Sequence, residues 1–504
     1  MVALPTPVRG IAALMALLSA AVACREPDGG RGLVIVGRSP IVSLDPVTND
    51  DYYAQNLFRN VFDSLVALDD TLRVVPALAT SWSSPSDHVW RFELRRGVSF
   101  HDGRTLAAGD VKATLDRARA SPQSWLAAHF ALVSDVRAPS PYLVEIETRV
   151  PVPLLLRRLS DVMVLPAGEI TGELPVGSGP YRLRSFVAGK EAVLEGFDAS
   201  WRGRPHWDRA VFRSEPDGAA RVERLLRREA DLIEAPPLEA APRIRASAAA
   251  RLVEREGVQV ALLGLDAQAR PGNPFGRFEA RRAVALSLDR AALVREALGG
   301  GGTAASQLAV PGVVGYVPDL APAPRDIGAA RAALAAAGFP RGFDSPLLFS
   351  ERDRRLAEGV ARQAAEAGVA FRLQELPWHV LDARLRARSS PAHVYFATFP
   401  SGDAAELLMD LHTPTSDASF GAYNFSGFSD RLLDDLLERA DLAMDPRVRI
   451  RLLERAQRRA TEAHALIPLV VPAQRFAVRR DIAWSGNGLG RIDLQAVREG
   501  PLLH

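Results

Sequence analysis

The sequence predicts an α/β protein, and the second half of the chain indicates this most clearly. Segments with apolar residues at helical spacing alternate there with short apolar runs that are typical of strands. Of the 504 residues, 47% are hydrophobic and 24% are charged, which are ordinary proportions for globular proteins. At about 150 residues per domain, the length corresponds to roughly three domain-sized units. We therefore expect a large packed core, and neither disorder nor a polytopic membrane protein.

The first expected elements are a short strand at residues 33–36 and, after a loop, a helix. The helix is indicated by apolar residues at helical spacing, namely Leu57, Phe58, Val61, Phe62 and Leu65. The middle of the chain alternates turns with short strands such as residues 143–148. Amphipathic helices are expected at residues 277–298, 327–337, 354–367, 430–442 and 447–465. Strands are expected between them at residues 369–373 and 393–397.

The charge balance argues against a nucleic-acid partner. The chain has 62 basic and 60 acidic residues, which gives a formal net charge of +2. A domain that follows phosphates usually shows a concentrated basic face, whereas these charges are spread along the chain. We therefore expect no nucleic acid among the partners.

The N-terminus has the pattern of an export signal. Arg9 is followed by a largely apolar run of about 13 residues, from Ile11 to Ala23, and then by Cys24. Spanning a membrane takes about 20 apolar residues, so the run fits a signal-peptide core better than a membrane helix. Ala21-Val22-Ala23-Cys24 resembles a lipobox, although alanine stands at the usual leucine position.

Cys24 is the only cysteine of the chain, and it falls where the apolar run ends. We expect a signal peptide at residues 1–23, a lipidated Cys24 at the mature N-terminus, and a polar tether at residues 25–31. The mature protein would then be anchored to a membrane on the extracytoplasmic side. The alternative is an ordinary cleaved signal peptide with an incidental cysteine. In either case no internal disulfide and no thiolate metal site is expected.

Two segments superficially suggest catalysis. His101 and Asp102 are adjacent, but no nucleophile is placed beside them by the sequence, so a turn is the preferred interpretation. Gly177-Ser178-Gly179 lacks the glycine spacing of a nucleophile elbow, and Pro180 blocks a following helix. The nine histidines include no HExxH motif, and the glycines at 299–302 lack a following Lys-Ser or Lys-Thr. No catalytic residue, metal or cofactor is therefore expected, and a hydrolase is the least favoured alternative.

Eight short blocks follow one another along residues 33–490. They are SLDP (43–46), VVPALATSW (74–82), FELRRGVSFHDGRTLAAGDV (92–111), PVGSGPY (175–181), FEARRAVALSLDR (278–290), AGFPRGF (337–343), NFSGFSD (424–430) and IPLVVP (467–472). In this order and at this spacing, the chain resembles solute-binding protein family 5, the periplasmic oligopeptide- and dipeptide-binding proteins. Each block alone is weak evidence for the family, and the resemblance is specific because all eight occur in the family's order.

The resemblance implies a two-lobe periplasmic-binding-protein fold of the class II type, with an extra insert domain in the first lobe. The implied divisions are the tether and start of lobe I (24–47), the insert domain (48–174), the lobe I core (175–265), lobe II (266–476) and a return to lobe I (477–504). The implied function is that of an extracytoplasmic solute-binding lipoprotein. It would capture a peptide or other small solute between hinged lobes and pass it, as a monomer, to the permease and ATPase subunits of an ABC importer. The sequence leaves open whether it feeds a sensor or chemoreceptor instead.

The resemblance also implies a ligand site, and one departure from the family concerns specificity. In peptide-binding members, a tryptophan precedes an aspartate that pairs with the α-amino group of the peptide. Here Tyr395 takes the tryptophan position and Thr398 takes the aspartate position. A threonine can hydrogen-bond an ammonium but cannot neutralise it, unless Asp403 substitutes through a folded-back loop. Peptides and other solutes, such as sugars, opines and metal chelates, therefore stay open.

The complete set of expected ligand contacts is Trp378, Tyr395, Thr398, Phe399, Asp403, Tyr423 and Asn424. For Trp378, the alternative is a tryptophan of the hydrophobic core.

Overall fold

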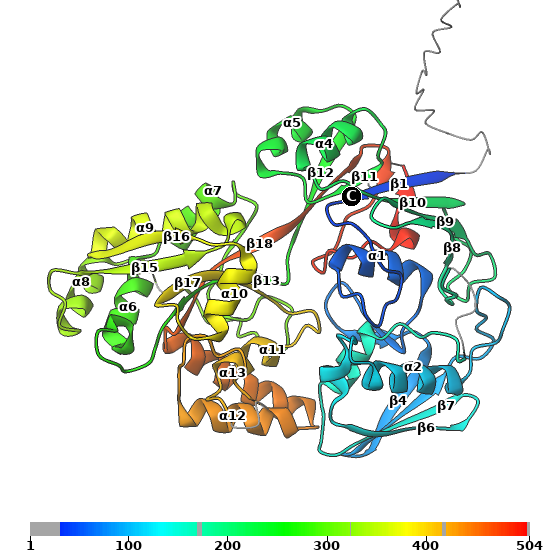
Figure 1. Ribbon diagram of the computed structural model, residues 1–504, viewed down its shortest axis with the longest axis horizontal. Helices are drawn as coiled ribbons and strands as arrows, with labels where there is room; N and C mark the ends of the chain where they lie inside the picture. The colour runs from blue at the N-terminus through cyan, green and yellow to red at the C-terminus, as the bar shows by residue number, and fades with distance from the viewer. Residues whose placement is uncertain (1–30, 169–173, 323, 416–419, 501–504) are drawn as a thin grey trace, which may run out of the picture.

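The structure is a computed structural model that describes residues 31–168, 174–322, 324–415 and 420–500. Figure 1 shows two α/β bodies joined by long strands in the middle of the molecule. We call the body at the right of this view lobe I and the body at the left lobe II. A 12-stranded sheet continues through both of them. The sheet itself therefore connects the lobes.

The strand that runs through both lobes is β18, Leu466–Arg479. Residues 466–472 of β18 pair with strands of lobe II, and residues 473–479 pair with strands of lobe I. The lobe II partners are β13 (Gln259–Leu265) and β14 (Gly302–Ala304), and the lobe I partners are β11 (Leu232–Glu234) and β12 (Ala250–Glu256). One continuous strand thus sets the register of both halves of the sheet.

The chain passes between the lobes a second time at the turn from β12 to β13. An added Cβ at Gly257 would lie 2.7 Å from the carbonyl oxygen of Pro472, so the two crossing segments touch. The pairing changes lobe at residues 257–258 and 472–473, somewhat before the boundaries at 265–266 and 476–477 that the sequence suggested. The first boundary shifts because all of β13 pairs with β17 (Ala392–Thr398) of lobe II.

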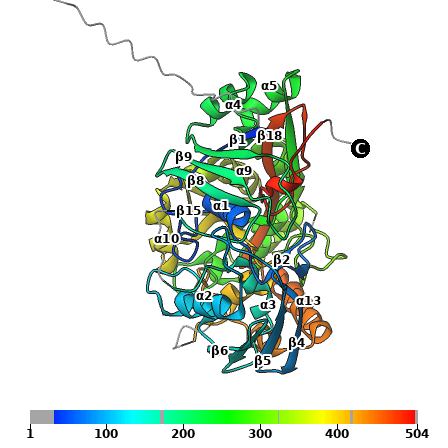
Figure 2. The same cartoon turned by 90° about the vertical axis from the view of Figure 1, so that its right-hand side faces the viewer.

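Lobe I is built on β1 (Gly32–Gly37), which contains the strand predicted at 33–36. β1 lies in parallel between β11 and β10. The remaining strands of this side of the sheet are β10 (Arg209–Ser214), β9 (Glu191–Gly196) and β8 (Tyr181–Val187). Helix α1 (Tyr52–Val61) packs on the sheet, and its Tyr53 hydroxyl donates to the Arg213 carbonyl at 2.9 Å. Figures 1 and 2 both show α4 (Gly218–Leu226) and α5 (Ala241–Ala246) at the end of the lobe opposite the insert.

The insert of lobe I forms its own antiparallel sheet. The strand order is β4 (Ala79–Ser86), β5 (Val89–Leu94), β7 (Leu143–Thr148) and β6 (Val133–Ser140). Helix α2 (Ala108–Ala120) packs on this sheet, and a hairpin of β2 (Val66–Leu68) and β3 (Val74–Pro76) precedes it. Most apolar side chains of the insert share one core with the rest of lobe I. The insert is therefore packed onto the lobe and not attached by a free linker.

Lobe II has the predicted alternation of helices and strands. Its strands besides β13, β14 and β17 are β15 (Phe343–Phe349) and β16 (Val369–Glu375). Its helices include α8 (Ile327–Ala336), α9 (Arg354–Ala367), α10 (Trp378–Arg386), α11 (Ala405–Leu408), α12 (Arg431–Leu442) and α13 (Pro446–Glu462). In the part of the chain that the structure describes, no helix combines the length and the apolar character that a membrane crossing requires.

The prediction of one helix at residues 277–298 was wrong. The structure has two helices there, α6 (Phe278–Ser287) and α7 (Arg290–Ala297). Leu288 takes an extended conformation, and the Asp289 side chain accepts a hydrogen bond from the Ala292 N–H at 2.9 Å. An aspartate that caps a new helix satisfies amides left without an intrahelical partner, so the apolar pattern continues while the helix does not.

After β18 the chain returns to lobe I and is held there by α1. The side chain of Asn60 is buried; it donates to the Ile492 carbonyl at 2.8 Å and accepts from the Leu494 N–H at 2.9 Å. The carbonyl oxygen of the Asn56 side chain accepts from the Ile492 N–H at 3.0 Å. These side chains serve the backbone of residues 492–494 as a neighbouring strand would. The C-terminal segment is thereby placed against the end of α1.

Candidate functional site

Strand β17 distributes the expected ligand residues over two faces. Successive side chains of a strand point to opposite sides, so Tyr395 and Thr398 lie on different faces of the sheet. Tyr395 is 7% exposed and Phe399, just after the strand, is completely buried in the core of lobe II. Thr398 ends the strand opposite Gln259 of β13 and is exposed. The motif therefore presents Thr398 to solvent and keeps Tyr395 and Phe399 inside.

An arginine between two aromatic rings shares the face of Thr398. The guanidinium carbon of Arg352 lies 5.5 Å from the ring centre of Trp378 and 5.6 Å from that of Phe396. Phe396 precedes Thr398 by two residues, which is about 7 Å along a strand. Trp378 is 50% exposed, which is not the burial of a core tryptophan. We call Arg352, Trp378, Phe396 and Thr398 the β17 face.

Tyr423 lies at the surface of a neighbouring loop. It is 46% exposed, and the guanidinium carbon of Arg386 lies 4.8 Å from its ring centre. Hydrogen bonds to Asp382 and to Tyr423 raise the pKa of Arg386. Phe425 contacts the rings of both Tyr423 and Tyr395, each at 6.0 Å between centres. Phe425 thus links the exposed tyrosine to the buried one.

A carboxyl group that the sequence did not single out lies under this aromatic cluster. Burial raises the pKa of Asp410 to about 7. The pKa of Tyr395 is also raised, mainly by burial and to a smaller extent by the negative charge of Asp410. Nothing in the motif spacing marks Asp410, because its burial depends on tertiary packing that no local pattern records.

The hypothesis that Asp403 folds back to replace the missing aspartate is corrected by its contacts. Asp403 is 1% exposed and forms a bidentate ion pair with Arg449 of α13, with Nη2 and Oδ1 at 3.1 Å. The same carboxylate accepts the Ala405 N–H at 2.9 Å at the start of α11. Because both carboxylate oxygens already bond to groups of the protein, Asp403 has a structural role.

Asn424 likewise satisfies its side chain within the protein. Its amide nitrogen donates to the carbonyls of His412 and Phe428 at 2.9 and 2.7 Å. Its amide oxygen accepts from the Phe428 N–H and the Ser426 hydroxyl at 3.2 and 3.1 Å. Through these contacts Asn424 stabilises the conformation of its loop. Phe399 is completely buried and belongs to the hydrophobic core. Ligand contact by Trp378, Thr398 and Tyr423 stays a prediction, supported by their exposure.

The loop after Thr398 touches lobe I. Arg157 of α3 (Leu155–Arg158), in the insert, donates to the carbonyls of Ser401 and Leu72 at 2.8 and 2.9 Å. An added Cβ at Gly402 would lie 3.0 Å from the Cβ of Leu72, and Gly402 has a φ of +69°. Leu72 itself belongs to the apolar core of lobe II. The β17 face therefore ends three residues from a contact between the two lobes.

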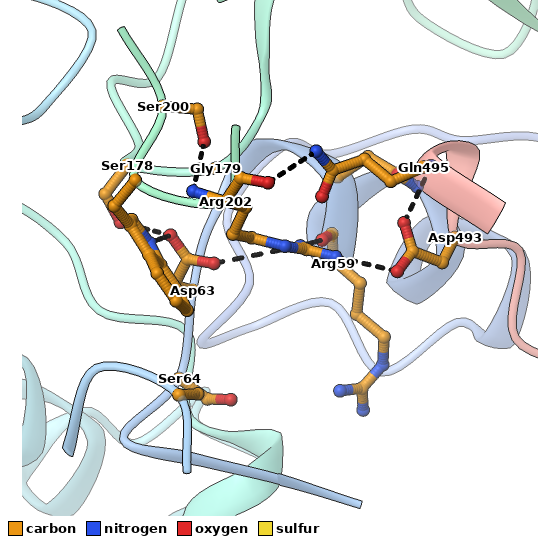
Figure 3. A network of polar contacts seen from close by, with 12 residues as sticks. Arg59, Asp63, Ser64, Ser178, Gly179, Ser200, Arg202, Asp493 and Gln495 are labelled. Atoms are coloured by element: carbon orange, nitrogen blue, oxygen red, sulfur yellow. Dashed lines mark hydrogen bonds and ion pairs between the residues drawn. The ribbon is translucent and has the colours of Figure 1, made fainter. Parts of the chain in front are cut away.

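His101 and Ser178 belong to the scaffold of lobe I. The hydroxyl of Ser178 and the indole N–H of Trp201 donate to the buried Asp63 carboxylate at 2.9 and 2.8 Å, in the network shown in Figure 3. Nδ1 of His101 accepts from the Gly177 N–H at 3.2 Å, so Nε2 carries the proton and donates to the Gly179 carbonyl at 3.0 Å. Burial lowers the pKa of His101 to about 4. Among the described residues, no three His, Cys, Asp or Glu side chains are grouped as metal ligands.

Two lobes joined by crossing strands, with an exposed face beside their contact, define the class of two-lobe solute-binding proteins. Residues 73–419, more than half of the chain, match the bacterial extracellular solute-binding proteins, family 5. The chain belongs to this family. The expected two-lobe fold and the expected family are thus confirmed.

Individual relatives cover nearly the whole chain. The glutathione-binding protein GsiB of Escherichia coli K12 is 27% identical over 467 residues, which are 88% of this chain and 89% of GsiB. HbpA2 from Haemophilus parasuis has a TM-score of 0.83 at 23% identity, covering 93% of this chain and 99% of that one. The periplasmic binding protein DppA from Helicobacter pylori, in complex with the peptide STSA, has a TM-score of 0.75 at 20% identity, covering 94% and 99%. The two solved structures show that the fold is shared.

We expect Asp403→Asn to lower the free energy of unfolding by about 3–5 kcal/mol, because it leaves the Arg449 guanidinium buried without a counter-charge. The matched control is Asp435→Asn, which breaks the exposed pair with Arg439 on α12 and should change stability by less than about 1 kcal/mol. Urea denaturation at neutral pH measures both. Equal effects of the two variants would contradict the structural role of Asp403.

Proposed function

We propose that this chain is an extracytoplasmic solute-binding lipoprotein of an ABC importer. It captures a small solute, a peptide or another compound, between its lobes and delivers it to the permease. The observation that carries the proposal is the position of the β17 face, exposed in lobe II and three residues from the contact of Ser401 with Arg157 of lobe I. Membership in the family supports the binding role.

The connection between the lobes suits capture by closure. Two crossing segments join the lobes, at residues 257–258 and 472–473, and each is short. A solute that touches both lobes gains its full set of contacts only when they approach each other, so it shifts the population toward the closed arrangement. Binding and closure are then one equilibrium, and the closed, loaded form is the one offered to the permease.

The β17 face supports a particular solute chemistry. It carries a positive charge at Arg352, whose Nε pairs with the buried Asp353 at 3.3 Å, and a neutral hydroxyl at Thr398. A carboxylate on the solute would be attracted by Arg352, while a free amine finds no fixed acid at Thr398. The GsiB relatives are glutathione-binding proteins by name, and the Helicobacter pylori neighbour holds a peptide. Peptide-like anions are therefore the first solutes to test.

The binding role predicts stoichiometric capture without turnover. Native mass spectrometry of the purified protein should reveal a co-purified small molecule, and chromatography should return that molecule intact after incubation. Since it binds the folded state, it should stabilise the protein by about 2.7 kcal/mol at about 100 times its Kd, as read from thermal unfolding. Consumption of the solute with repeated turnover would overturn the proposal.

The anchor is tested separately, because Cys24 lies outside the described residues and lipidation stays a prediction from the sequence. Cells fed an alkyne fatty acid should label the wild type, while Cys24→Ser should be exported unlabelled. N-terminal mass spectrometry should find a modified Cys24 at the start of the mature wild-type chain. An unlabelled mature protein that begins at another residue would contradict the anchor and leave the binding role intact.

The specificity of the β17 face is tested at Thr398. Thr398→Asp should tighten binding of short peptides with a free amino terminus by about tenfold, because a carboxylate can form a charge-assisted hydrogen bond with the ammonium. The matched control Thr398→Asn adds no charge and should give no gain, and N-acetylated peptides should gain from neither variant. Isothermal titration calorimetry measures both peptide forms with the wild type and with each variant. If the wild type already binds free-amine peptides tightly and acetylation abolishes binding, a carboxylate elsewhere anchors the amine.

A further inference from the structure

Lobe I contains a cavity of about 300 Å³ that none of the predicted ligand residues lines. It lies between the end of α1, the β2–β3 hairpin and the C-terminal segment around residues 487–493. Its apolar wall includes Phe62, Met163, Trp201 and Leu489. The volume is at the lower end of the range for small-molecule sites, which begins at about 300 Å³. A compound of a few heavy atoms would fit.

Most charges on the cavity wall are balanced within the protein. Arg202 pairs with Asp493 at 2.7 Å and approaches the Asp63 carboxylate at 3.8 Å, as Figure 3 shows. Arg59 pairs with Asp161 at 2.8 Å and donates to the Ser160 carbonyl at 3.1 Å. These groups therefore need no ligand to compensate them.

Arg491 is the exception on this wall. Among the described residues, the only hydrogen bond of its guanidinium is a long one, 3.5 Å from Nη1 to the Leu68 carbonyl. Its nearest carboxylate, Asp161, is 3.9 Å away and already bonds Arg59. Burial and the charge of Arg59 lower the pKa of Arg491 to about 9. A guanidinium has five N–H donors, and leaving a desolvated cation unpaired is costly, so an anion in the cavity would relieve this site.

The other wall charges restrict which anion can enter. Asp63 and Asp493 line the same cavity, and the exposed Asp70 lies at its wall as well. These carboxylates repel a multiply charged group such as phosphate more than a single charge. The apolar rings and side chains next to them favour a compound with a short hydrocarbon part.

We propose that this cavity of lobe I is a second binding site, which takes a small monocarboxylate through Arg491. The carboxylate bonds the guanidinium, and the hydrocarbon part packs against Met163, Trp201 and Leu489. The site is separate from the β17 face. The segment 487–489 also borders a second cavity of about 340 Å³, whose wall includes Gly257 at the crossing between the lobes. A ligand in the first cavity would therefore contact the segment 487–489, which also borders the crossing between the lobes.

The test uses the mature full-length protein labelled with ¹⁵N at its tryptophan indoles, and propionate as the probe. The indole N–H of Trp201 donates to Asp63 on the cavity wall, and Trp201→Phe assigns its signal. Propionate should shift this signal saturably in the wild type. Arg491→Gln should weaken the response at least tenfold, while Arg204→Gln, which breaks an exposed pair nearby, should leave it unchanged. Thr398→Asp should also leave it unchanged.

Two comparisons keep the result interpretable. Propionamide, which lacks the charge, and inorganic phosphate at equal ionic strength should each give at most a tenth of the propionate response. Arg491→Lys keeps the charge and should retain a partial response, which separates loss of the anion partner from misfolding. An equal response in Arg491→Gln, or an equal response to propionamide or phosphate, would falsify the site. Loss of the response in Thr398→Asp would show that propionate binds the β17 face instead.

Discussion

The 14 residues of β18 hydrogen-bond to strands of both lobes, and the position of the other elements depends on this shared strand. Its first half holds β13 and β14, and its second half holds β11 and β12. Pro472 lies where the partners change, and a proline is tolerated there because no ladder needs its missing N–H. Gly257 is in contact with Pro472, so the two crossings form one joint. At this joint the pairing passes from the strands of one lobe to those of the other.

The joint also determines where β17 ends. β17 pairs with β13 along its full length, which carries Thr398 to the end of the sheet near the crossing. Behind it, the buried pair of Asp403 with Arg449 holds the loop that meets Arg157 of lobe I. The buried ion pair orders the loop, while Thr398 and Trp378 stay exposed on the β17 face. The loop that follows the exposed Thr398 is thus also the loop that contacts lobe I.

About half of the candidate site was accessible to sequence reasoning. The family resemblance indicated Thr398 and Trp378, and both are exposed as a ligand contact requires. The same resemblance suggested Asp403 and Asn424, whose polar groups bond to partners far along the chain or across a loop. Arg352 and Phe425 were missed, because both reach the site only through packing. Arg352 lies outside the eight blocks, whereas Phe425 lies within NFSGFSD and follows Asn424 directly.

The sequence by itself determined the local elements and the family. Side-chain periodicity and capping residues act within a few positions, so α9 and β7 were predicted at their observed bounds. The break at Leu288 was missed, and so was the end of α1 at Val61, before the apolar Phe62 and Leu65. The order of the eight blocks identified the fold. The tertiary structure decided which polar groups are free. Asp403 meets its partner 46 residues away, and Arg491 is left nearly without one, because the pairing of charges depends on distances in space that no local pattern records.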